Sequence, residues 1–155
     1  MRKQYHIRDS ERGPLAWDVD RLIRLTLGQE PVDVLLESIR ELDERFWFSG
    51  AGEVPTCRRV AEHARLINET DLEHPVILDP DGRVMDGMHR ICKALIHGSP
   101  TIKAVRLSTM PEPDFVDIPV DELPYESAEP SAAPKGGPTA RLGDSGVAEE
   151  PPSVS

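Results

Sequence analysis

The sequence has few aromatic residues, only two cysteines and no long apolar run. Aromatic side chains make up 5% of its 155 residues. A membrane-spanning helix needs roughly 20 mostly apolar residues, so the sequence predicts none. Residues 1–8 are partly basic, but charged residues follow them instead of an apolar stretch, which argues against a secretory signal. We therefore expect a cytoplasmic protein that does not enter a membrane.

The two cysteines, Cys57 and Cys92, lie far apart and form no Cys-x-x-Cys pair. Regularly spaced cysteines mark the disulfide frameworks of small secreted domains, and paired cysteines mark many zinc sites. Neither feature is expected here. We interpret both residues as structural thiols.

Positive charge is also scarce, because 18 Lys and Arg residues stand against 28 Asp and Glu residues, for a formal net charge of −10. Non-specific affinity for DNA comes mainly from Lys and Arg side chains that neutralise phosphates. DNA is therefore not an expected partner. A local group of basic residues would still suffice to bind a single nucleotide. The sequence leaves the oligomeric state open.

Composition divides the chain into three segments. Residues 126–155 are rich in Pro, Ser, Ala and acidic residues and lack aromatic side chains. Such a segment cannot bury enough apolar surface to offset the entropy cost of ordering, so we predict a disordered, acidic, proline-rich tail. Residues 1–31 are expected to be an N-terminal segment with one helix, and residues 32–125 the main domain.

Hydrophobic spacing and turn residues predict an α/β (α+β) domain, with a small mixed sheet and helices. Asp18 is a good N-cap for a first helix that Gly28 ends, and Thr56 caps a second helix. A third helix begins at Gly87 and ends at Gly98. Its expected buried face consists of Met88, Ile91, Cys92 and Leu95. The expected strands span residues 32–36, 76–78, 83–85, 101–107 and 115–118.

The segment from Asp86 to Arg90 is the candidate functional site, because it joins the predicted hairpin to the third helix. The first N–H groups of a helix lack intrahelical partners and lie at the positive end of its dipole, where anions bind. Gly87 lets a phosphate approach the backbone, and basic His89 and Arg90 oppose the dipole unless an anion is present. Asp86 either caps the helix or holds a metal ion that bridges phosphate oxygens.

An alternative interpretation gives this segment no function. Asp86 then only caps the helix, and His89, Arg90 and Lys93 only form a solvated polar stripe. A short Gly-x-His-Arg string is common by chance, so its spacing alone does not decide between the two interpretations. The predicted hairpin before it and the strand after it are the surroundings that a phosphate site requires, and they favour function.

The stretch from Pro75 to Leu95, followed by residues 102–105, resembles the nucleotide-binding core of the ParB/sulfiredoxin superfamily. That superfamily places a Gly-x-x-Arg-x-x-Ala type of segment at a helix start, which is matched here by Gly87, Arg90 and the pair Lys93-Ala94. The resemblance implies a ParB/sulfiredoxin-like fold that binds ATP or CTP, with Mg²⁺ as the accompanying ion.

The similarity covers residues 32–107, of which residues 34–39 resemble the first strand of the family and residues 57–68 the helix before its hairpin. The family includes DNA-partition clamps, sulfiredoxins and kinases that phosphorylate free serine. Sulfiredoxins carry a catalytic cysteine where this chain has Met88. The clamps continue into a helix-turn-helix domain, whereas this chain continues into the predicted acidic tail. We therefore expect neither of these two activities.

What remains is a nucleotide-binding domain that acts as a phosphotransferase on a small hydroxyl substrate, or alternatively a non-catalytic regulatory or protein-interaction module. For a kinase, the resemblance implies an acidic base after the first strand. Glu41, Asp43 and Glu44 are the candidates, and Glu41 is preferred. The expected catalytic residues are Glu41, Asp86 and His89, with Asp86 also the expected metal ligand. The expected nucleotide-binding residues are Gly87, Met88, His89, Arg90, Lys93, Arg58 and Arg59.

Other residues near these helices have two interpretations each. Arg58 and Arg59 start the second helix, where a second anion contact would explain them, but Glu62 is spaced to pair with them and pairing is favoured. His63 either faces the same cleft or lies on the surface. Trp47 either stacks on a nucleobase or packs against the core, and core packing is favoured.

Overall fold

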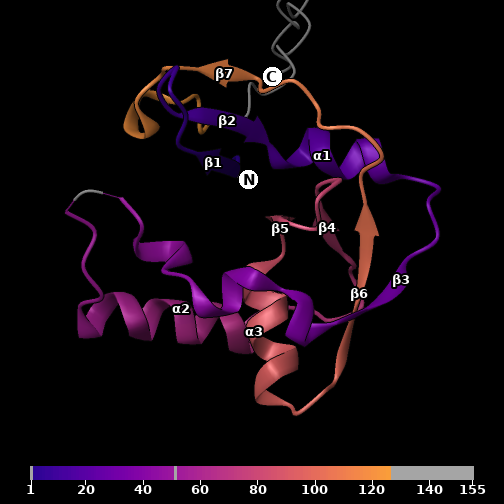
Figure 1. Cartoon of the computed structure of the whole chain (residues 1–155). Coiled ribbons are helices and arrows are strands. Elements are labelled where there is room, and N and C mark those ends of the chain that lie inside the picture. Colours follow the sequence, from indigo (N-terminus) through magenta and orange to yellow (C-terminus); the bar gives the residue numbers. More distant parts are fainter. Residues whose placement is uncertain (1, 51, 127–155) are drawn as a thin grey trace, which may run out of the picture.

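The computed structural model describes residues 2–50 and 52–126, which form an α+β fold with two sheets (Figure 1). The predicted tail lies outside the described residues, apart from Glu126. No helix in the described ranges is long and apolar enough to cross a membrane.

The larger sheet has four strands and carries the predicted hairpin. Its order is β3-β6-β4-β5, with β4 and β6 parallel and the other neighbours antiparallel. The parallel pair is possible because β5 and the following helix form the crossover between the two strands. The strands are β3 (Val32–Leu35), β4 (Val76–Leu78), β5 (Val84–Asp86) and β6 (Thr101–Arg106). All four match predicted strands.

The smaller sheet contains two strands that the sequence analysis does not predict. β1 (Tyr5–Arg8) and β2 (Leu15–Asp18) pair with each other, and β2 also pairs with β7 (Phe115–Val116). The predicted last edge strand is therefore shorter than expected and belongs to this second sheet. The N-terminal segment and the end of the predicted main domain thus build one sheet together.

Three α-helices connect the strands, and each begins where the sequence predicts. The Asp18 carboxylate caps α1 (Val19–Thr26), and the Thr56 hydroxyl caps α2 (Cys57–Glu69). α3 (Met88–Ile96) follows Gly87. Short 3₁₀ helices fill the connections: η1 (Leu36–Ser38), η2 (Arg40–Asp43), η3 (Phe46–Phe48) and η4 (Val120–Glu122).

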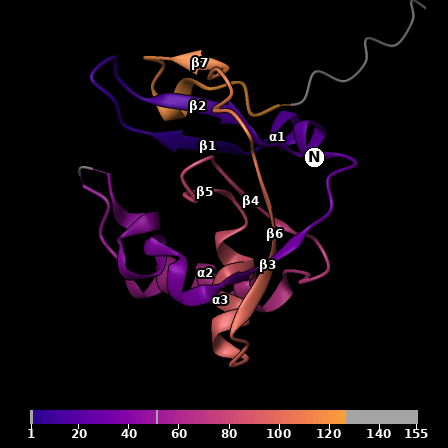
Figure 2. The same cartoon turned by 45° about the vertical axis from the view of Figure 1, so that its right-hand side comes forward.

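The larger sheet lies between two layers, with α2 and α3 on one side and the small sheet with α1 on the other (Figures 1 and 2). Because side chains alternate along a strand, β4 serves both sides. Its Val76 and Leu78 join the core beneath α3, and Ile77 joins a second cluster with Trp17 and Leu22. All three β4 side chains are buried, as expected for a strand that is covered on both faces.

One part of the predicted core is wrong. Met88 and Ile91 are buried on α3 as expected, but Leu95 is 53% exposed and Ala94 is buried in its place. The buried stripe follows steps of three residues along this short helix, so Leu95 lies beyond its edge. Cys92 is only partly buried.

Candidate functional site

The start of α3 is built around Gly87, which has a left-handed backbone with φ +105°. A Cβ atom at this position would lie 2.6 Å from Cγ1 of Val76 and 2.8 Å from Nη2 of Arg90. Glycine is thus required by both the backbone conformation and the packing. The N-cap residue Gly87 has no side chain that could cap α3, so the N–H groups of the first turn donate to no N-cap side chain.

A cavity of about 820 Å³ lies at this helix start, and we call it the α3 cavity. The segment Asp86–Arg90 forms one wall of it. The opposite walls come from segments that are distant in sequence: Arg2–Tyr5, residues of α1, the end of α2, and Tyr125. The structure therefore brings five consecutive predicted site residues to one cavity.

Besides His89, three basic and three acidic side chains line the α3 cavity. Its basic residues are Arg2, Lys3 and Arg90, and its acidic residues are Asp20, Glu69 and Asp86. Lys3 is bound to Asp18 through a 2.7 Å ion pair. The guanidinium of Arg2 lies 4.4 Å from the centre of the Tyr125 ring.

The Asp86 carboxylate forms an ion pair with Arg90. Its Oδ2 lies 2.8 Å from Nη2 of Arg90, and both side chains are largely buried. The expectation that Asp86 caps the helix is wrong, because its carboxylate binds the arginine side chain and not the backbone. The described residues also contain no cluster of three or more His, Cys, Asp or Glu side chains that could hold a metal ion. Nε of Arg90 is buried, and no described group accepts its hydrogen bond.

His89 is part of a cluster of three rings. Its Nε2 lies 2.9 Å from Nδ1 of His63, and the Trp47 ring stacks on both imidazoles, with centroid distances of 4.6 Å to His89 and 4.1 Å to His63. Trp47 also packs against the core beneath α3, as predicted. His63 contacts His89 but does not line the α3 cavity, so its predicted position in the same cleft is not confirmed.

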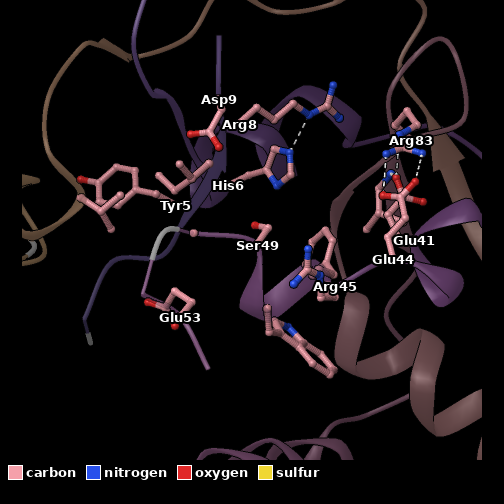
Figure 3. Close-up of a pocket in the computed structure, with 16 residues that line it drawn as sticks. Tyr5, His6, Arg8, Asp9, Glu41, Glu44, Arg45, Ser49, Glu53 and Arg83 are labelled. Atoms are coloured by element: carbon pink, nitrogen blue, oxygen red, sulfur yellow. Dashed lines mark hydrogen bonds and ion pairs between the residues drawn. The ribbon is translucent and has the colours of Figure 1, made fainter. Parts of the chain in front are cut away.

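Glu41 lies in a different cavity. This second cavity, of about 740 Å³, lies between β1 and the η2–η3 connection, and we call it the β1 cavity (Figure 3). Oε1 of Glu41 accepts a hydrogen bond from the Val84 backbone N–H and forms an ion pair with Nε of Arg83, each at 3.0 Å. Glu44 holds the same guanidinium through two 2.8 Å bonds. Glu41 is 3% exposed and secures the β4–β5 hairpin to η2, so it does not meet Asp86 or His89 in one site.

Three of the predicted nucleotide-binding residues also lie away from the α3 cavity. Nζ of Lys93 binds the backbone oxygens of Asn68 and Thr70 at the end of α2, at 3.0 and 2.6 Å. Arg59 pairs with Glu53 at 2.6 Å, not with Glu62 as predicted. Arg58 lines a separate hollow on the surface of α2, together with Ala61, Glu62 and Arg65.

No sequence pattern predicts that Arg2, Lys3 and Tyr125 line the α3 cavity. They reach it because the small sheet brings both ends of the described chain together: the backbone N–H of Lys3 donates to the Tyr125 oxygen at 2.8 Å. No local pattern marks this long-range contact. Neither a known protein family, nor a characterised protein, nor a solved structure matches the chain.

Proposed function

We propose that the chain is a nucleotide-binding domain that holds the phosphates of ATP or CTP in the α3 cavity. The observation that carries the proposal is the uncapped start of α3, which lies behind Gly87 and beside Arg90 in a large cavity. Helix N-termini of this kind attract phosphate through free N–H groups and the helix dipole. The volume of about 820 Å³ lies within the range of known ligand pockets.

Arg90 supplies the positive side chain of the proposed site. It is held in place by Asp86, and its buried Nε has no acceptor among the described residues. A phosphate oxygen near α3 would compete with Asp86 for this guanidinium, and bidentate binding of phosphate is characteristic of arginine. Mg²⁺ would then be carried mainly by the nucleotide phosphates, as is usual for this ion.

The geometry supports binding better than phosphoryl transfer. A transferase needs an acceptor group and its base beside the phosphates. Glu41 lines the β1 cavity instead, where its Oε1 binds Arg83 and the Val84 backbone. A non-catalytic module that binds nucleotide and regulates a partner is therefore our preferred form of the proposal. If the protein transfers phosphate to a small hydroxyl compound, it should release ADP from ATP only when that acceptor is present. Glu41→Gln should leave the rate of ADP release unchanged if a residue of the α3 cavity supplies the base.

The first prediction is that ATP, ADP or CTP with Mg²⁺ raises the melting temperature of the protein. A ligand at 100 times its Kd contributes about 2.7 kcal/mol, which corresponds to a rise on the order of 5 °C or more for a chain of this size. Arg90→Ala should abolish the rise. The matched control is Arg58→Ala, which removes the same charge from the separate hollow on α2 and should keep the rise.

Arg90→Ala also leaves Asp86 without its partner, so each variant is first melted without nucleotide to establish that it is folded. Arg90→Lys keeps the charge but loses the planar fork, and it should retain only part of the shift. Equal shifts in the wild type, Arg90→Ala and Arg58→Ala would show that nucleotides bind elsewhere. No shift with any of the three nucleotides would leave the protein-interaction module as the better hypothesis.

A further inference from the structure

Three aromatic rings from three separate elements meet beside the α3 cavity: Trp47 of η3, His63 of α2 and His89 of α3. The two imidazoles are joined by the 2.9 Å contact between Nδ1 of His63 and Nε2 of His89, and their planes differ by only 22°. The indole is within 19° of parallel to both. We call His63 and His89 the imidazole pair, and Trp47 lies over both rings. Only His89 lines the cavity directly.

The contact between the imidazoles limits how many protons the pair can hold. In the neutral pair, one facing nitrogen carries hydrogen and the other accepts it. A single added proton is compatible with this bond, because an imidazolium donates to the remaining neutral ring. A second added proton would place two N–H groups face to face and break the bond. The geometry therefore accommodates one extra proton and opposes a second.

The surroundings of the unliganded pair disfavour its protonated form. Burial, and then the charge of Arg59, lowers the pKa of His63, against Glu62, which raises it. Burial lowers the pKa of His89, followed by His63 and Arg90, against Asp86, which raises it. Among the other residues that line the cavity, Arg2 and Lys3 carry positive charge and Asp20 and Glu69 carry negative charge, so these charges balance.

An anion at the start of α3 would change this balance. His89 lies in the first turn of the helix, where a positive side chain is unfavourable without an anion and favourable with one. The Trp47 face would also stabilise the cation, since indole rings attract positive charge. His63 would accept the hydrogen bond of a protonated His89 and so share its charge.

We propose that His63 and His89 form a one-proton site beneath Trp47, and that proton uptake by this pair strengthens phosphate binding in the α3 cavity. The second half of the inference rests on the proposed nucleotide site, whereas the first half does not need it. Affinity for a nucleotide should then rise as the pH falls below neutral. His63 acts as a positioning residue, because it reaches the phosphate only through His89.

The first experiment follows the ring nitrogens of the histidines by NMR in the ligand-free wild type between pH 8 and pH 4.5. His63 and His89 should shift together with one shared midpoint below 6.5, and the hydrogen-bonded nitrogens should respond most. His74 and His97, which lie away from the pair, provide internal references on the same spectra. Two separate midpoints near the ordinary value of about 6.5 would overturn the one-proton site.

The second experiment measures ATP binding by calorimetry at pH 6 and pH 8, in buffers of different ionisation enthalpy, to count the protons taken up. ATP itself titrates in this range, so the comparison is with His63→Phe, which keeps a ring against Trp47 but cannot accept a hydrogen bond. On going from pH 8 to pH 6, wild-type affinity should increase on the order of threefold to tenfold more than that of the variant, because one pKa unit corresponds to tenfold in affinity.

The two experiments separate the failure of each idea. A shared midpoint without binding of either ATP or CTP would leave the pair in place and reject both the nucleotide site and the proposed coupling. ATP binding with equal pH dependence in the wild type and His63→Phe would support the nucleotide site and overturn the coupling.

Discussion

Gly87 combines a backbone conformation and a closeness of packing that no side chain permits. Its positive φ disfavours any other residue, and Val76 and Arg90 occupy the space of a Cβ atom. Gly28 is a natural comparison, since it also has a positive φ, of +80°, but no neighbouring atom within 4 Å of the added Cβ. Comparing alanine substitutions at Gly87 and Gly28 therefore separates the cost of backbone strain from the cost of steric overlap.

We predict that Gly87→Ala lowers the free energy of unfolding by about 2–5 kcal/mol, because left-handed strain costs about 1–2 kcal/mol and overpacking about 1–3 kcal/mol. Gly28→Ala should cost only about 1–2 kcal/mol, since strain acts there without overlap. Urea denaturation of the two variants gives both values. A similar loss in both would show that the space around Gly87 relaxes, and would weaken its role in shaping the α3 cavity.

Local patterns predict the residues of the helix start correctly, but they do not predict which basic side chains point into the cavity. Asp86 to Arg90 are contiguous, so strand, turn and helix alone bring them to one place. Arg58, in the first turn of α2, and Lys93, in the last turn of α3, are also predicted to bind nucleotide, yet their contacts depend on where α2 crosses α3. That crossing is a property of the fold and leaves no mark within either helix.

At the scale of elements, Lys93 connects α3 to the end of α2. Its ammonium group binds two backbone oxygens there, where the helix dipole is negative and the last carbonyls lack intrahelical partners. This contact is important for α2, because none of the side chains on that 13-residue helix is fully buried. The basic stripe predicted along α3 therefore has a structural use at this position.

We predict that Lys93→Met lowers the free energy of unfolding by about 1–2 kcal/mol, since the apolar stem is kept and the hydrogen bonds to two carbonyls are lost. Nucleotide-dependent stabilisation should persist in this variant. Lys103→Met is the control, because Lys103 forms only an exposed pair with Asp33 and should change stability by less than about 1 kcal/mol. If Lys93→Met, but not Lys103→Met, abolishes the stabilisation by nucleotide, Lys93 takes part in nucleotide binding.

Elements with contiguous sequence patterns are predicted well, and elements that depend on distant partners are not. The β4–β5 hairpin and α3 have their turn, cap and apolar residues close together, and both are confirmed. β1 and β2 are four residues each and carry polar residues at several positions. Their sheet also depends on β7, about a hundred residues later, and on contacts such as Nε1 of Trp17 with the Pro111 oxygen at 2.8 Å.

At the scale of the whole molecule, a polar chain of contacts links the two sheets. Nε of Arg8 on β1 donates to Nε2 of His6 at 2.8 Å, and Nη1 of Arg8 pairs with Asp79 in the β4–β5 turn at 2.8 Å. His6 must be neutral to accept the first of these bonds. Burial first, and then the charge of Arg8, lowers the pKa of His6 to about 3.

The joint between the sheets should therefore weaken in mild acid. Because the folded pKa of His6 is below the unfolded value of about 6.5, its stabilising contribution is complete above pH 6.5 and is lost as the pH falls toward 3. Between pH 6.5 and pH 5 the loss is about 2 kcal/mol, at 1.36 kcal/mol per pH unit. His6→Gln should lack this component, so its free energy of unfolding should change less over the same interval.

Urea denaturation at pH 7 and pH 5 measures this difference in slope, whatever the stability of the variant at pH 7. Parallel losses in the wild type and His6→Gln would mean that His6 accepts a proton without disturbing the fold. His74→Gln offers a control, because it makes the same substitution at an exposed histidine.

The backbone bond between Lys3 and Tyr125 makes the rim of the α3 cavity from two stretches that lie more than a hundred positions apart. Trimming the chain up to Gln4 would uncover the start of α3 while every residue of the Asp86–Arg90 segment stayed in place. The affinity for a ligand of the α3 cavity would then depend on whether the segment with Lys3 is paired with the segment with Tyr125. A bulky fusion near Arg2 would act on binding directly, even though it lies about eighty residues from the motif in the sequence.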